Sequence, residues 1–319
     1  MTDTPWISSS GAENAAALRT LYPEVFAAIA EIDRLGHLLL NRVGGSGEAK
    51  GVAFLVGVGL LRKSVATFVG FRALIESSAI DPAKALARTH FELWLHYRCF
   101  IYGAEGKMLP FTSLNAADRE TRARRYYVSA QRRGLRARAL IVAPDSQYRA
   151  KDVEARDALE KELQEELTRL RTEFREEWDF FGDVTVGRLI AHVGGNDERP
   201  WFSASFLPSK VNSIKDLAYS YGAHWEYDFV YDMLSSQIHP RGLSADLTIG
   251  DDAIEIHHPN NADWFPMLVY WTTAWHLMLL MAAARAFAPV VEADLQRFDL
   301  QHGAALRALK MDPSIWSLG

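Results

Sequence analysis

The chain has 319 residues, and its 35 Lys and Arg residues against 40 Asp and Glu residues give a formal net charge of −5 at pH 7. This balance excludes a protein whose whole surface is a polycation for nucleic acid, although it allows local basic patches. Hydrophobic residues at 49% and charged residues at 24% are typical of a folded globular protein. The single cysteine, Cys99, excludes a disulfide framework and a cysteine-based zinc site. Because no signal-peptide pattern is visible, we expect a cytoplasmic protein.

The N-terminal half of the sequence has the periodicity of helices. Apolar residues recur at spacings of three and four between residues 12 and 42, with a helix break or start at Pro23. A glycine-rich connection at 43–49 leads to a long, mostly buried helix predicted over 52–78. Another apolar helix is predicted over 83–102, after the Asp-Pro start at 81–82. This succession predicts an all-α, multi-helix bundle that forms a single domain over residues 1–319.

The most basic stretch of the sequence lies between residues 118 and 138. Its eight arginines are Arg119, Arg122, Arg124, Arg125, Arg132, Arg133, Arg136 and Arg138. The next stretch, 151–178, mixes acidic and basic residues around a narrow seam of leucines, so we expect a long antiparallel helical hairpin inserted at about 115–180. The arginines have two interpretations, a solvated face whose charges pair within the molecule or a surface for RNA or a protein partner at Arg119–Arg138.

Two segments in the C-terminal part depart from amphipathic helices. Short β segments joined by a turn predict a minor β-hairpin near 246–256. The uncharged run from Trp264 to Ala284 is long enough to cross a membrane. Pro266 and the near-central His276 argue against a membrane span, so we expect this run to be the core helix of a protein with no membrane association.

Standard catalytic motifs are missing from the sequence. It has no P-loop, no zincin histidine pair, no nucleophile elbow and no dinucleotide fingerprint. These absences argue against nucleoside-triphosphate hydrolysis, metalloproteolysis and α/β-hydrolase chemistry, and we expect no metal and no cofactor.

Two polar clusters are the candidates for a site. Arg88 and Glu92 are spaced i, i+4 on a strongly apolar helix, so we expect them to be partly buried and bonded to each other and to another helix. Tyr231 and Ser235 lie one turn apart near a helix end that reaches His239, where the helix terminus favours a protonated imidazole. Two interpretations remain open. In the first, Tyr231, Ser235 and His239 satisfy Arg88 and Glu92 in a structural polar network. In the second, His239 forms an acid/base and phosphate-binding site with Arg88 or Arg241.

These residues carry a family resemblance. The Arg-x-x-x-Glu helix at Arg88 and Glu92, and the Tyr-x-x-x-Ser-x-x-x-His helix end at Tyr231, Ser235 and His239, resemble the bacterial domain-of-unknown-function family numbered 5677 over about residues 50–285. The resemblance implies an all-α bundle and no established activity.

That family is similar in general character to the HEPN helical domains, many of which are metal-independent ribonucleases of toxin and antiphage systems. Their usual signature is an arginine followed by four to six residues and a histidine, often acting across a dimer interface. This chain has one such spacing, Arg297 and His302. The resemblance therefore implies a possible homodimer and adds Arg297 and His302 to Arg241 as candidate substrate-binding residues.

Two functional hypotheses follow. In the first, a helical protein binds RNA or nucleotide phosphate, or cleaves RNA as a metal-independent endoribonuclease, and acts as a toxin or defence effector. Its catalytic candidates are His239, Arg88, Glu92, Tyr231 and Ser235. In the second, the protein is a non-enzymatic helical interaction module whose polar clusters are structural.

Overall fold

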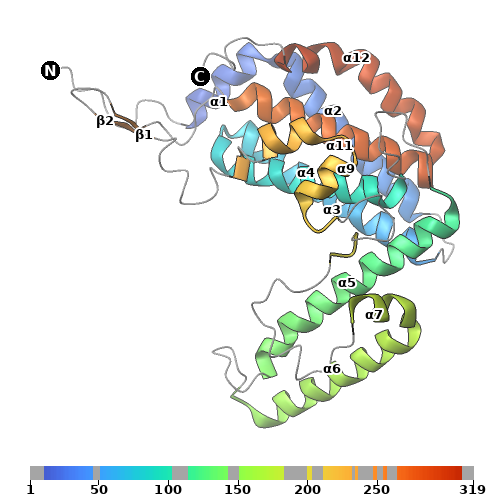
Figure 1. Ribbon diagram of the computed structural model, residues 1–319. Helices are drawn as coiled ribbons and strands as arrows, with labels where there is room; N and C mark the ends of the chain where they lie inside the picture. Colours follow the sequence, from blue (N-terminus) through green and yellow to red (C-terminus); the bar gives the residue numbers. More distant parts are fainter. Residues whose placement is uncertain are drawn as a thin grey trace. The chain divides into compact units, whose positions relative to one another are not determined.

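A computed structural model describes residues 11–45, 51–102, 114–142, 151–182, 200–202, 211–231, 234–235, 247–249, 254–256 and 264–310 (Figure 1). Helices dominate these residues, so the predicted all-α class is confirmed. The chain divides into two compact units. Unit 1 contains residues 1–49, 57–101 and 221–319, and unit 2 contains residues 50–56 and 102–220. This is a finer division than the single domain expected from the sequence.

Unit 1 begins with four helices whose bounds are close to those predicted. They are α1 (Gly11–Leu21), α2 (Pro23–Gly44), α3 (Val52–Glu76) and α4 (Ile80–Ile101). Pro23 separates α1 from α2 because its fixed φ suits the first position of a helix and it has no N–H to continue the preceding one. The start of α4 differs from the prediction, because Asp81 lies within the first turn and pairs with Lys84 at 2.6 Å instead of preceding the helix.

The core of unit 1 forms around α11 (Phe265–Phe287), which lies alongside α4 and α12 (Glu292–Lys310) (Figure 1). A short 3-10 turn, η4 (Pro289–Val291), joins α11 to α12. Within the described residues, α3 and α11 are long and apolar enough to cross a membrane by length and composition alone. The most apolar part of α11 is 72% buried inside the protein, which fits the predicted core helix, whereas that of α3 is 39% buried.

The remaining described elements of unit 1 are short. A six-residue π-helix, η1 (Glu226–Tyr231), follows a short turn that begins at residue 221. Two strands, β1 (Leu247–Ile249) and β2 (Ile254–Ile256), pair antiparallel with Thr248 opposite Glu255.

Unit 2 is built on α5 (Ala116–Val142), α6 (Val153–Glu173) and α7 (Arg175–Phe181), with a short helix α9 (Ile214–Ser220). Arg138 pairs with Glu162 near one end, and Arg124 bonds the Glu173 carbonyl near the other. These contacts confirm that α5 and α6 are antiparallel. A shared apolar cluster fills the space between α5, α6 and α7. Its members include Val128, Leu135, Leu163, Leu167, Leu170 and Trp178.

Side chains mark the starts of the unit 2 helices. Asn115 accepts from the Asp118 amide at 2.8 Å, Asp152 accepts from the Ala155 amide at 3.1 Å, and Ser213 accepts from the Asp216 amide at 3.1 Å. Each bond satisfies a helix N–H that has no partner within its own helix. Helix α9 therefore has Ser213 as its N-terminal cap.

Candidate functional site

The candidate site lies in unit 1, between α4 and η1. Arg88 and Glu92 are one turn apart and therefore share a face of α4. Phe91 and Trp94 bury other faces of the same helix in the core of the unit. Tyr231 is the last residue of η1.

Tyr231 joins the two charged side chains of α4. Arg88 Nη2 donates to the Tyr231 hydroxyl at 3.1 Å, and this hydroxyl donates to Glu92 Oε1 at 2.8 Å. Arg88 Nε also lies 3.4 Å from Glu92 Oε1, and the guanidinium carbon is 5.0 Å from the centre of the Tyr231 ring. The expectation that Arg88 and Glu92 bond each other and a polar group from another helix is confirmed.

The Arg88 and Glu92 side chains are not sealed in the core, because they are 28% and 34% exposed. An arginine side chain has five N–H groups. In Arg88, Nε faces Glu92 and one N–H of Nη2 bonds Tyr231, while the other three have no partner among the described residues. Arg88 is thus oriented by two neighbours and retains donors for a ligand.

The Tyr231 phenol is a donor in this site. Burial and the neighbouring Glu92 carboxylate raise the pKa of Tyr231 to about 12. The phenol is therefore neutral at physiological pH and directs its hydrogen at Glu92. It can orient the carboxylate or donate to a ligand, but it cannot act as a base near neutral pH.

The backbone that carries Tyr231 is unusual. Six consecutive residues of η1 form a π-helix, a conformation that is rare and is found frequently at functional sites. Aromatic rings brace it, because Tyr227 stacks on Tyr231 at 4.9 Å and Phe91 of α4 lies 5.2 Å from the Tyr231 ring. The helix expected at Tyr231 is thus a π-helix there, with wider turns than an α-helix.

The other predicted site residues do not join this network in the described part of the chain. Ser235 donates to the Tyr231 carbonyl at 2.7 Å, so it supports the backbone of Tyr231. His239 and Arg241 lie outside the described residues. Arg297 pairs with Asp294 at 3.0 Å, and His302 packs against Phe298. Five residues apart on the continuous helix α12, the Arg297 and His302 side chains point about 140° apart around its axis.

A second polar cluster in unit 1 was not identified from the sequence. Ser64 of α3, His90 of α4 and His276 of α11 meet in the core, with hydrogen-bonding atoms 3.0 to 3.1 Å apart. All three residues have zero exposed area. The available signal was a polar residue at a buried position of each apolar helix, but the sequence cannot show that the three positions meet.

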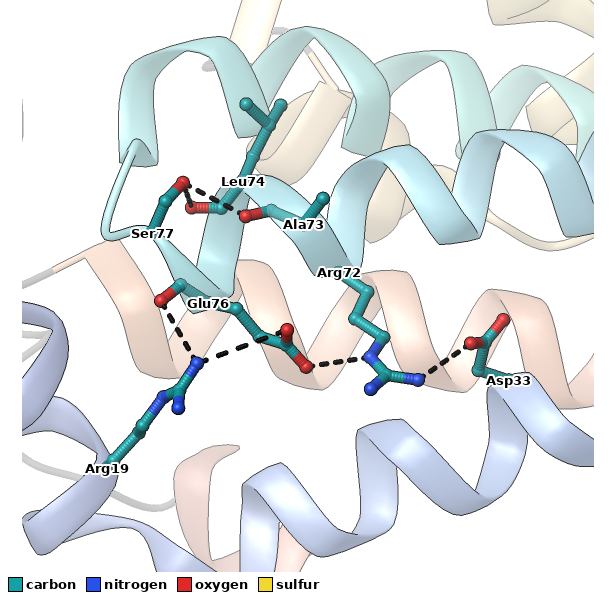
Figure 2. Close-up of polar contacts among 7 residues, drawn as sticks. All are labelled: Arg19, Asp33, Arg72, Ala73, Leu74, Glu76 and Ser77. Carbon is teal, nitrogen blue, oxygen red and sulfur yellow. Dashed lines mark hydrogen bonds and ion pairs between the residues drawn. The ribbon is translucent and has the colours of Figure 1, made fainter.

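A third cluster is a chain of ion pairs between α1, α2 and α3 (Figure 2). Arg19 lies near Glu76, which pairs with Arg72 at 2.7 Å, and Arg72 also pairs with Asp33 at 2.8 Å. Charges alternate along this chain, so each side chain has an opposite neighbour. We interpret this arrangement as a clamp that holds the three helices together.

Most arginines of α5 make contacts inside unit 2. Arg122 donates to the Tyr102 carbonyl, Arg132 donates to the Gly182 carbonyl, and Arg124 pairs with Glu177. Three others also make contacts in unit 2. Arg125 lies over the Phe180 ring, Arg133 donates to Ser129, and Arg138 pairs with Glu162. These contacts support the interpretation that the arginines of α5 pair within the molecule.

No group of three or more His, Cys, Asp or Glu side chains that could hold a metal ion occurs among the described residues. The chemistry that the Arg88 cluster itself offers is anion binding by a guanidinium and proton exchange with a carboxylate.

Comparison with curated proteins and with solved structures found no match. The model of the family of unknown function DUF5677 matches residues 54–256, which is more than half of the chain. The matched region includes α3, α4, unit 2 from Tyr102 onward and η1, and therefore Arg88, Glu92, Tyr231 and Ser235, whereas Arg297 and His302 lie beyond it. The chain belongs to the DUF5677 family.

Proposed function

We propose that unit 1 binds a phosphate group of RNA or of a nucleotide at Arg88, without a metal ion. The observation that carries this proposal is that Arg88 is partly exposed, is oriented by Glu92 and Tyr231, and retains three N–H groups without a partner among the described residues. A guanidinium held in one orientation can bond two phosphate oxygens at once. The rare π-helix that carries Tyr231 supports a site that is under functional constraint.

Cleavage of RNA is the reaction that this site would support. Glu92 or His239 takes the proton of a ribose 2′-hydroxyl, and that oxygen attacks the adjacent phosphorus. The bond from phosphorus to the 5′-oxygen breaks, the leaving oxygen takes a proton, and a 2′,3′-cyclic phosphate remains. Arg88, with Arg241 as the second candidate, stabilises the charge on the phosphate oxygens. The HEPN-like resemblance supports this chemistry and a role as a toxin or defence effector.

The binding test uses fluorescence anisotropy of a labelled single-stranded RNA in buffer with EDTA. Adenosine monophosphate and inorganic phosphate are added as competitors in separate arms. We expect Arg88→Gln to weaken RNA binding at least tenfold, since one charged hydrogen-bonded contact is worth about 1.5–3 kcal/mol. Arg34→Gln is the matched control, because Arg34 also lies on a unit 1 helix and pairs with a glutamate, Glu31, at 2.6 Å.

The competitor arms identify the source of the phosphate. If the nucleotide displaces RNA and inorganic phosphate does not, the site takes nucleotides, and if neither competes, it takes the polymer. Release of 2′,3′-cyclic phosphate ends in EDTA would support cleavage. Wild-type protein that binds none of the three probes and leaves total RNA intact would contradict the proposal.

The competing function is a helical interaction module, with a homodimer or a protein partner at Arg119–Arg138. The observation that favours it is that Arg88, Glu92 and Tyr231 already bond one another. The two functions differ in the effect of His239→Ala. Loss of activity at an unchanged melting temperature favours a site, whereas a stability loss of about 1–3 kcal/mol with no other effect favours a structural network.

A further inference from the structure

The Ser64, His90 and His276 cluster is a polar centre inside an apolar core. Ser64 Oγ lies 3.1 Å from His90 Nε2 and 3.0 Å from His276 Nδ1, and these two nitrogens are 3.0 Å apart. Two hydrogens are enough to satisfy the three facing atoms, one from the serine hydroxyl and one from a single imidazole. With both rings neutral, the cluster therefore joins α3, α4 and α11 by hydrogen bonds.

In each imidazole, the ring nitrogen that faces away from the cluster lacks an acceptor for an added proton among the described residues. His90 Nδ1 and His276 Nε2 are buried and have no hydrogen-bond partner among the residues that the structure describes. Gly36 of α2 packs so closely that a Cβ there would lie 3.4 Å from His276 Nε2, and Phe68 of α3 stacks on the His276 ring at 4.2 Å. An imidazolium in this position would bury an unpaired charge.

Among the described residues, no carboxylate forms an ion pair with either ring on the elements that pack here. On α2, Asp33 pairs with Arg72 through one oxygen and lies 3.7 Å from His37 through the other, and a proton on His37 would oppose one on His276. On α3, Arg62 and Lys63 beside Ser64 are exposed. On α11, the other ionisable groups are Tyr270 and Arg285, and on α4 the charged pair Arg88 and Glu92 lies on a different face from His90.

The cluster and the candidate site share a helix. His90 lies between Arg88 and Glu92 in the sequence, about half a turn around α4 from both. The next residue, Phe91, contacts the Tyr231 ring at 5.2 Å and Trp275 of α11 at 5.0 Å. A displacement of α4 from α11 would therefore also separate Arg88 and Glu92 from Tyr231.

We propose that Ser64, His90 and His276 form a proton-sensitive lock that holds α4 in the position from which Arg88 and Glu92 reach Tyr231. This inference names the regulation of the proposed phosphate site, and therefore rests on the proposed function for its biological role. His90 is a positioning residue, because it acts through α4 and touches no ligand. Acidification opens the lock, since the imidazoles can take protons only when α4 leaves the core.

Proton linkage determines how steeply the opening of the lock depends on pH. Burial lowers the pKa of His90 to about 3, and burial together with His90 and His37 lowers the pKa of His276 well below its ordinary value. Below about pH 6.5, each histidine that becomes accessible on opening favours the open form by about tenfold per pH unit. The expected signature is a loss of the Tyr231 contacts on the acid side of neutrality.

The experiment follows Tyr231 directly, without a ligand. Tyrosine labelled with 13C at the ring Cζ is incorporated into the full chain, and the Tyr231 signal is assigned with Tyr231→Phe. We expect the wild-type signal to move from its hydrogen-bonded position toward that of an exposed tyrosine between pH 6.5 and 4.5. Circular dichroism recorded in parallel reports global unfolding.

Two variants and one control separate the lock from ordinary titration. His90→Gln and His276→Asn keep a polar atom near the position of the bonding nitrogen, but neither amide takes a proton in this pH range. The pH at which the Tyr231 signal moves should therefore fall by at least one unit when the two substitutions are combined. Phe100→Leu, a buried substitution on the same helix, should leave its pH unchanged. Direct protonation of Glu92 would be unaffected by the histidine substitutions.

Each outcome decides the proposal. A transition that keeps the wild-type pH in the combined variant overturns it, as does a wild-type signal that moves only when circular dichroism reports global unfolding. If the combined variant does not fold, hydrogen exchange of the wild-type α4 amides decides instead, through protection factors that fall or do not fall between pH 7 and 5. RNA binding is measured at the same pH values. If the Tyr231 signal moves as expected while wild-type protein binds no RNA at any pH, the result supports the lock and contradicts the proposed phosphate site.

Discussion

The two units bury polar groups of opposite character. The fully buried polar residues at the centre of unit 1 are uncharged hydroxyl groups and two histidines whose pKa burial lowers. They are Ser64, His90, Thr272, Thr273 and His276. Its charged buried residues, Asp33 and Lys84, pair with side chains that reach solvent. Unit 2 instead buries Arg122, Arg132 and Glu177. The difference follows from the apolar surface that each unit has available.

Unit 1 packs helices that are apolar on most sides, so a charge at its centre would be far from water and from a counter-charge. Unit 2 packs helices rich in charged residues around a narrow seam of leucines and aromatics, and long arginine side chains complete its interior. Arg132 shows this use, since its guanidinium lies 4.7 Å from the Trp178 ring centre while it donates to the Gly182 carbonyl at 2.9 Å. Charge in unit 2 is therefore part of its core.

The largest expected effect is a loss of stability in the core of unit 2. Arg132→Ala removes a buried side chain that contacts Trp178 and bonds the Gly182 carbonyl, so we expect a loss of about 3–5 kcal/mol in the stability of unit 2. Arg133→Ala, the neighbouring exposed arginine, is the matched control and should cost less than about 0.5 kcal/mol. Hydrogen exchange resolved by peptide measures each unit separately. Similar losses for the two variants would contradict the distinction between core and surface arginines.

The second prediction concerns the neutral core of unit 1. The folded pKa of His90, about 3, lies below its ordinary value of about 6.5, so the unfolded state binds more protons between these values and stability falls as pH falls. His90 alone should cost about 2–3 kcal/mol between pH 7 and 4.5, since one pH unit in this window is worth 1.36 kcal/mol.

Guanidinium unfolding at a series of pH values measures this loss, and His90→Gln should flatten the curve. His224→Gln is the control, because it replaces a histidine of unit 1 that is exposed. A wild-type curve that is flat from pH 7 to 4.5 would show that the core tolerates the protonated ring. The result would then remove the contrast between a neutral core in unit 1 and a charged one in unit 2.

A smaller effect is expected where a charge caps a helix. The Glu120 carboxylate accepts from the Val52 and Ala53 amides at 3.0 and 2.9 Å. These amides lie in the first turn of α3, which belongs to unit 2 together with Glu120. Gly51 leaves room for it, because a Cβ at residue 51 would lie 2.9 Å from Glu120 Oε2. We expect Glu120→Ala to cost about 1–2 kcal/mol, by loss of both bonds and of the favourable charge at the helix N-terminus.

The control for the cap is Glu165→Ala on α6, where the exposed carboxylate is 3.9 Å from Lys161 and should contribute less than about 1 kcal/mol. Hydrogen exchange of the first turn of α3 measures the capping effect locally. If both glutamates cost the same, the carboxylate at the start of α3 would be no more important than a surface ion pair.

The sequence predicted the helices and the pairing of Arg88 with Glu92 because both depend on local spacing. The helical period identified α2, long apolar stretches identified α3 and α11, and an i, i+4 pair lies on one face of any α-helix. One of the two interpretations of the polar clusters joined Tyr231 to this pair, but the sequence could not decide between them, because the contact bridges 139 residues, and it did not indicate a π-helix. The meeting of His90 with His276 bridges 186 residues and depends equally on packing. Counting arginines in α5 likewise left open whether they pair within the molecule or form a binding surface, because the burial of Arg122 and Arg132 depends on tertiary contacts.

The smallest expected effect is a gain in unit 1. Ser78, in the turn between α3 and α4, has a φ of +59°, which is unfavourable for a residue with a Cβ. It occupies the position after the helix where glycine is preferred, and the Ala79 amide bonds back to the Leu74 carbonyl at 2.8 Å. The Ser78 hydroxyl is buried and has no hydrogen-bond partner in the described part of the chain.

Ser78→Gly removes both the steric cost at positive φ and the unsatisfied hydroxyl, so we expect a gain of about 1 kcal/mol despite the added flexibility of the unfolded chain. Ser77→Gly is the matched control, because Ser77 donates to the Ala73 and Leu74 carbonyls (Figure 2) and should lose stability when replaced. Thermal unfolding of the two variants gives the sign. A loss for Ser78→Gly would mean that the buried hydroxyl contributes to the turn, and that unit 1 gains stability from a neutral polar group even where no partner bonds it.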